Sequence, residues 1–204
     1  MPAHARARFW PHARSRALTR LHVPYSCPSL HDGLQRTLRV AQVQAAAALS
    51  SMARDNLVTQ TAIAKAGGIG PLLALLQSRS GAAQAQSMSA LAQLAKDNRE
   101  NQDAIARQGG IKPLVLLLET SHDRNVQAYA AFALNVITRF NSPNQTSVVD
   151  CGGISQLASA MKTSQFPEVK AEVAGALWSL SEDMAIKGWI AAAATIHPLV
   201  NLLG

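Results

Sequence analysis

The sequence predicts an all-α fold, an α-solenoid of stacked three-helix repeats that follows a disordered, basic N-terminal arm. Three observations lead to this prediction. A short motif returns every 42 or 43 residues, the repeating body lacks the alternation of a β-strand, and arginines gather near the N-terminus. The 48% content of hydrophobic residues in a chain of 204 is enough for a sizeable core.

The N-terminal segment differs in composition from the rest of the chain. Residues 1–36 hold six arginines, one acid and four prolines, and so carry a net charge of +5 out of +7. Because no helical or strand period runs through it, we predict a disordered arm over residues 1–37. Its composition also resembles an organelle transit peptide, and its arginines could contact nucleic acid or anionic lipid.

Two landmarks hold one period through the body of the chain. Isoleucines follow the Gly-Gly pairs or their equivalent at Ile69, Ile111, Ile154 and Ile196, and the leucine of an Ala-Leu pair returns with the same period. These leucines are Leu49, Leu91, Leu134 and Leu177. We therefore predict a repeat domain over 38–204, with a third helix at 38–55, full repeats at 56–97, 98–140 and 141–182, and a partial repeat at 183–204.

Each copy is expected to form three helices. The first starts at an asparagine or another polar residue and ends at the Gly-Gly pair, where glycine can adopt a left-handed conformation. The second is short and apolar, with Pro71, Pro113 or Pro198 in its first turn. The third is the longest and is rich in alanine, which lets neighbouring helices pack closely.

These motifs resemble those of the armadillo repeat. The resemblance rests on the Gly-Gly-Ile-x-Pro-Leu turn, on the Ala-Leu-x-x-Leu helix and above all on residues 176–181, Ala-Leu-Trp-Ser-Leu-Ser. It covers residues 38–204 and leaves out the arm. It implies a right-handed superhelix whose third helices line a concave groove, and a family of adaptors that bind proteins without catalysis.

Candidate groove residues follow from the repeated leucine. Positions two before and two after it lie four apart, on one face of the third helix. None of them is the Trp or Asn that import receptors of this family use to grip basic peptides, so we do not expect that function. The apolar pair Phe132 and Val136 could seat a partner's side chain. Trp178 lies one position off this face and is expected to pack between repeats. The predicted groove residues are Ser51, Ser89, Gln93, Phe132, Val136 and Ser179.

Catalytic, metal and cofactor sites are not expected. His122 and Asp123 lie in a turn, and no glycine-flanked serine accompanies them. Cys151 has no histidine nearby, and the Gly-Gly pairs lack the lysine of a phosphate-binding loop.

The sequence thus predicts a non-enzymatic scaffold or adaptor that binds an extended segment of a protein partner. Two alternatives stay open: a nucleic-acid or anionic-membrane binder that acts through residues 1–37, and a substrate-recruiting fragment of a larger ubiquitin ligase. Two cysteines and no transmembrane-length apolar run predict an intracellular, cytoplasmic location, with organelle targeting by the arm as the alternative. Because the chain ends where a third helix should begin, we expect a fragment of a longer protein or a truncated array.

Overall fold

The computed structural model describes residues 28–203, and their side chains from residue 35 onward. The chain divides into two units, Met1–Arg36 and Thr37–Gly204. The described part of the first unit is the beginning of helix α1, and the account below concerns the second unit.

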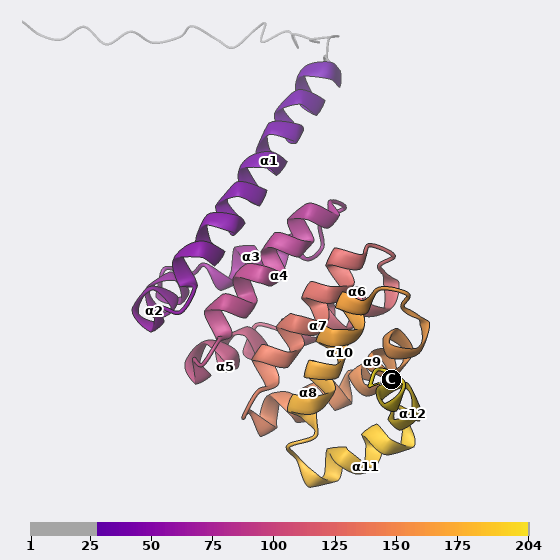
Figure 1. Cartoon of the computed structure of the whole chain (residues 1–204). Helices are drawn as coiled ribbons and strands as arrows, with labels where there is room; N and C mark the ends of the chain where they lie inside the picture. Colours follow the sequence, from indigo (N-terminus) through magenta and orange to yellow (C-terminus); the bar gives the residue numbers. More distant parts are fainter. Residues whose placement is uncertain (1–27, 204) are drawn as a thin grey trace, which may run out of the picture. The chain divides into compact units, whose positions relative to one another are not determined.

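All regular structure in residues 28–203 is helical, which confirms the predicted all-α solenoid (Figure 1). Within this range no helix is both long and apolar enough to cross a bilayer. The helices are α1 (Pro28–Ala53), α2 (Leu57–Lys65), α3 (Ile69–Leu75), α4 (Gly81–Ala95), α5 (Arg99–Arg107), α6 (Ile111–Thr120), α7 (Arg124–Thr138), α8 (Ser142–Asp150), α9 (Gly153–Thr163), α10 (Pro167–Leu180), α11 (Met184–Ala192) and α12 (Ile196–Val200).

Helix α1 starts ten residues before the predicted start at residue 38. The prediction of disorder was therefore wrong for residues 28–37. A signal was present in the sequence: leucines recur every fourth residue at 30, 34 and 38, which is a helical period, and proline is favoured in a first helical turn. The remaining expectations for the arm fall on residues 1–27, which lie outside the described residues.

The two glycines of each Gly-Gly pair serve different purposes. Gly67 has φ +80°, in the left-handed region where a side chain is strained, and so ends α2. Gly68 has an ordinary conformation, but a Cβ atom there would lie 2.7 Å from Ile63 Cγ2. One glycine therefore turns the chain and the next lets α3 start close against α2.

The third helices of successive repeats pack side by side. In Figure 1, α4, α7 and α10 follow one another across the stack. Buried alanines such as Ala90, Ala131 and Ala133 lie on these helices and join the continuous core. Their small side chains let the helices approach closely, as predicted.

A ladder of buried amides connects the repeats behind these helices. Asn98 caps α5 by accepting a bond from the Asn101 N–H, and its own Nδ2 donates to Gln60 Oε1 at 3.1 Å. Asn141 repeats this arrangement at α8, with Nδ2 donating to Gln102 Oε1 at 3.0 Å. Each bond joins one repeat to the next.

The glutamines also tie consecutive third helices together. Gln102 Nε2 donates to Ala95 O at the end of α4 (3.3 Å) and to Val136 O in α7 (3.0 Å). Gln145 Nε2 does the same with Thr138 O (3.1 Å) and Ser179 O (2.9 Å). The glutamine amide thus supplies donors to carbonyls that their own helices leave unpaired.

We predict that Gln102→Leu lowers the free energy of unfolding by about 2–3 kcal/mol, because it removes the donor to Val136 O and an acceptor of the buried Asn141 amide. Urea denaturation followed by circular dichroism at 222 nm measures this change. Gln165→Leu, in the exposed α9–α10 loop, is the matched control and should leave the midpoint unchanged. Equal midpoints for the two variants would show that the ladder does not stabilise the stack.

Candidate functional site

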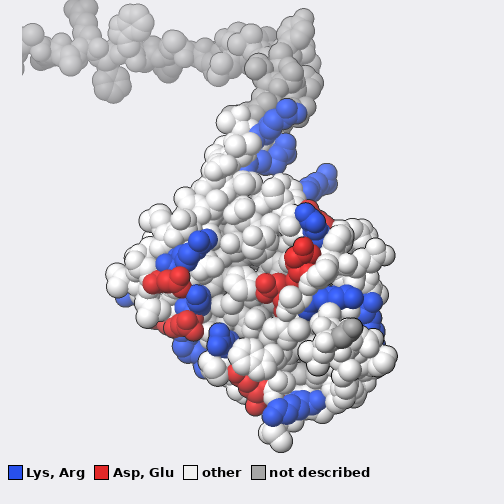
Figure 2. All heavy atoms as spheres, viewed as in Figure 1, with Lys and Arg blue, Asp and Glu red and all other residues white. Residues whose placement is uncertain are grey.

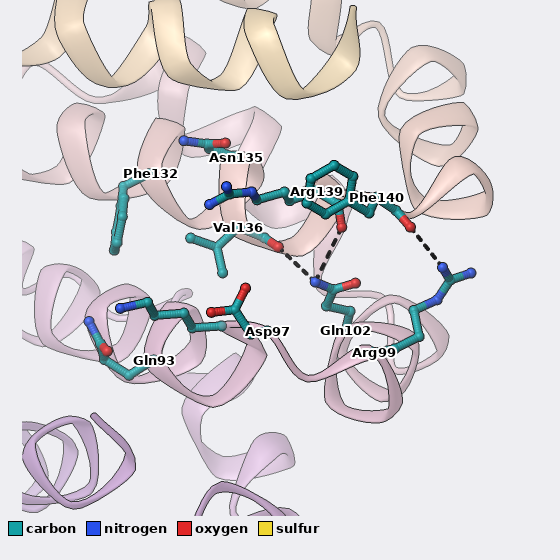
Figure 3. A pocket seen from close by; sticks show the side chains of 10 residues that line it. Gln93, Asp97, Arg99, Gln102, Phe132, Asn135, Val136, Arg139 and Phe140 are labelled. Carbon is teal, nitrogen blue, oxygen red and sulfur yellow. Dashed lines mark hydrogen bonds between the residues drawn. The ribbon is translucent and has the colours of Figure 1, made fainter. Parts of the chain in front are cut away.

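A hollow of about 450 Å³ lies where α4, α5 and α7 meet at their turns. Figure 3 shows side chains from all three helices around it. It contains both apolar and charged groups, so it can accept a side chain and orient its polar neighbours. Its lining residues are Gln93, Lys96, Asp97, Arg99, Gln102, Phe132, Asn135, Val136, Arg139 and Phe140.

Three of the residues predicted for the groove, Gln93, Phe132 and Val136, line this hollow. Phe132 and Val136 lie one turn apart on α7, and both are partly exposed, so they form an apolar wall. Gln93 faces them from α4 (Figure 3). The leucine-based spacing argument therefore brings residues of two different repeats to one place.

The three predicted serines lie elsewhere. Ser51 is exposed on α1, and Ser89 is partly exposed on α4 with its Oγ 3.0 Å from Ser50 Oγ. Ser179 is fully buried, and its Oγ lies 2.9 Å from Thr138 Oγ1 on α7. Its short side chain turns to the neighbouring helix to hydrogen-bond, so it offers no groove surface.

Half of the hollow comes from turn residues that the helix-face argument left out. Lys96, Asp97, Arg139 and Phe140 stand in the turns that follow α4 and α7, and Arg99 begins α5. The recurrence of a cation two positions before each asparagine was visible in the sequence. It marks the turn, but it does not say which way the cation points.

Two of the three lining cations are engaged in ion pairs. Lys96 Nζ lies 2.6 Å from Asp55 Oδ1, and this hydrogen bond and attraction lower the pKa of Asp55 and raise that of Lys96. Arg99 Nε lies 3.1 Å from Asp103 Oδ1. Both pairs are exposed, so they orient the side chains more than they stabilise the fold.

Arg139 makes no ion pair among the described residues and instead stacks on two aromatic rings. Its Cζ lies 5.3 Å from the centroid of Phe140 and 5.5 Å from that of Trp178. Trp178 belongs to the repeat after Arg139, so this contact joins two repeats although 56% of Trp178 is exposed. Asp97, which corresponds to Asp55 in the next repeat, is left without a cation in the described part of the chain.

Gln93 on α4, across the hollow from the apolar wall, has an unpaired acceptor. Gln93 Oε1 is buried and receives no hydrogen bond from any described residue. A buried acceptor without a donor is costly. The hollow therefore combines the apolar wall of α7 with a glutamine of α4 whose amide oxygen is not paired.

Phe140 holds a backbone conformation that is unfavourable for its side chain. Its φ of +53° lies in the left-handed region, where Asp55 and Asp97 stand in the equivalent turns. Two contacts hold it: Arg99 Nη1 donates to its carbonyl at 2.9 Å, and its N–H donates to Glu182 Oε2 at 3.2 Å. The result is a phenylalanine ring that is 68% exposed at the edge of the hollow.

The charged surface has no single dominant sign. Figure 2 shows lysines and arginines interspersed with acids on the displayed face, between wide uncharged areas. Among the described residues, no three His, Cys, Asp or Glu side chains come together as metal ligands would. This mixed surface is therefore suited to contact a binding partner and to orient it.

Comparison with known proteins gives one family and several similar structures. The Armadillo/beta-catenin-like repeat matches residues 98–139 and 141–182. An engineered protein from the Northeast Structural Genomics Consortium is 36% identical with a TM-score of 0.76, over 81% of this chain and 66% of that one. Another is 34% identical with a TM-score of 0.73, over 79% of this chain and 39% of that one.

A third similar structure is a designed armadillo repeat protein in complex with the peptide (KR)4. It is 24% identical with a TM-score of 0.73, over 81% of this chain and 73% of that one, and it supports the fold alone. The chain thus spans 66% or less of the first engineered relatives that it matches. Among curated proteins, none matches it.

We predict that Phe140→Asn raises the free energy of unfolding by about 1 kcal/mol relative to Phe140→Leu. Both variants lose the ring and its stacking on Arg139, but only asparagine tolerates the left-handed conformation well. Thermal unfolding of the two variants side by side measures the difference. Identical midpoints would mean that the turn does not strain Phe140.

Proposed function

The chain is an armadillo-repeat protein, and we propose that it acts as a non-enzymatic scaffold that holds an extended segment of a partner protein. The segment would cross α4 and α7 at the hollow between them. Stacked repeats provide a rigid, extended surface on which many small contacts add up.

The observation that carries this proposal is the apolar wall in a hollow shared by two repeats. Phe132 and Val136 are partly exposed on α7, and Gln93 of α4 lines the same hollow opposite them. An extended segment alternates side chains and backbone N–H groups. One of its apolar side chains would pack against this wall beside Gln93.

The charges support a partner of mixed polarity for this part of the groove. Arg139 and Asp97 both line the hollow, and neither makes an ion pair with a described residue. The designed protein that holds (KR)4 binds a purely basic peptide. Here an exposed arginine at the hollow would repel such a peptide, so we expect a segment with an acidic side chain near Arg139.

The test uses short peptides selected on the full chain from a random displayed library. We predict that Phe132→Ala combined with Val136→Ser weakens the best peptides about tenfold or more, because truncating buried anchors costs that much at other interfaces. Fluorescence anisotropy of labelled peptides measures the dissociation constants.

The matched control is Val58→Ser combined with Leu116→Ala. Both residues are exposed apolar side chains on first and second helices, outside the hollow. The control should bind like the unmodified chain. Equal binding by the groove variant and the control would remove the groove from the proposal.

A further inference from the structure

The last junction between repeats differs from the two before it in charge and in hydrogen bonding. The two before it have Lys96-Asp97-Asn98 and Arg139-Phe140-Asn141, whereas the last has Ser181-Glu182-Asp183. The cation is lost and the capping asparagine becomes an aspartate. The difference affects the end of the amide ladder.

At the two junctions before it the capping asparagine donates to the glutamine of the preceding repeat. Asp183 still caps its helix, since Oδ1 accepts bonds from the N–H groups of Ala185 and Ile186. A carboxylate has no hydrogen to donate. Only 3% of Gln145 is exposed, and its Oε1 receives no hydrogen bond from any described residue.

Gln145 also lines an open hollow of about 490 Å³ at the α8 and α11 ends. Phe140, Ser142, Gln145, Glu182 and Asp183 line it. Neither carboxylate forms an ion pair with a described cation. The nearest cation along α11, Lys187, instead lies with Nζ 3.4 Å from Met184 Sδ.

We propose that this hollow, which we name the rim site, binds the side chain of an arginine from a protein partner. Its polar lining is rich in acceptors: the two carboxylates of Glu182 and Asp183 stand beside Gln145 and the Ser142 hydroxyl. A guanidinium group presents several planar N–H donors and stacks on aromatic rings, and Phe140 supplies an exposed ring.

The rim site is separate from the groove hollow, although Phe140 lines both. The acceptors belong to the turn after α10 and the start of α11, and not to the third-helix face that the groove proposal uses. A variant that disrupts binding at one site therefore still allows binding at the other site to be tested.

The test is an NMR titration of the full, ¹⁵N-labelled chain at low salt. The probe is the blocked tripeptide Gly-Arg-Gly, and the same peptide with citrulline in place of arginine is its neutral counterpart. We expect the arginine peptide to shift the side-chain amide of Gln145 and the backbone amide of Glu182. The citrulline peptide should shift neither, because it is uncharged and the carboxylates prefer a cation.

Two variants then separate the charge from the acceptor. Glu182→Gln should weaken binding about threefold, as expected for one exposed carboxylate. Asp183→Asn should abolish the Gln145 shift, because the new amide can donate to Gln145 Oε1 as Asn98 and Asn141 do in their junctions. It should also raise the unfolding midpoint, since it extends the ladder by one bond.

Glu168→Gln, an exposed carboxylate on α10 outside the rim site, is the control and should bind like the unmodified chain. Equal shifts from the arginine and citrulline peptides would overturn the proposal. So would an unchanged Gln145 shift in Asp183→Asn. Neither result would bear on the groove, whose test depends on Phe132 and Val136.

Discussion

The buried amide ladder is the interaction on which the arrangement of the repeats depends. Gln102 reaches carbonyls at the ends of two successive third helices, and its oxygen accepts from Asn141, which caps the next repeat. Apolar packing alone is non-directional and tolerates small shifts between helices. The hydrogen bonds of the amides tolerate few such shifts, because a displaced helix would leave a buried donor or carbonyl unpaired.

The ladder also builds the candidate site. Gln102 lines the groove hollow and bonds to Val136 O, so the backbone of the apolar wall is fixed from behind (Figure 3). The outward side chains of Phe132 and Val136 then stand at defined positions without contributing bonds of their own. A site held by rigid elements loses less conformational entropy when a partner binds.

The repeat boundaries and helix order could be predicted because their signals are local and recur. The glycine pairs, the first-turn prolines and the Ala-Leu pairs each determine structure within a few residues. Because all three recur with the same period, together they indicate where each repeat begins and ends. The turn residues could not be predicted in the same way. Whether Arg139 pairs with Asp97 or stacks on Phe140 depends on a positive φ at residue 140 and on Trp178 from the next repeat.

Ser179 shows the same limit on a helix face. It shares the spacing that places Gln93 and Val136 at the hollow, but its hydroxyl can bond to Thr138 and the side chain is short enough to turn inward. Periodicity gives the face of a helix, and the size and polarity of each side chain decide whether it is available there.

Two departures from the repeat pattern lie at adjoining turns. Phe140 takes a strained conformation where the earlier repeats have aspartate, and Asp183 leaves Gln145 without the donor that Gln60 and Gln102 receive. Each change costs stability by itself, since strain and a lost hydrogen bond are both unfavourable. Both lie around one exposed ring between two hollows, where Glu182 accepts a hydrogen bond from the Phe140 N–H and also lines the rim site.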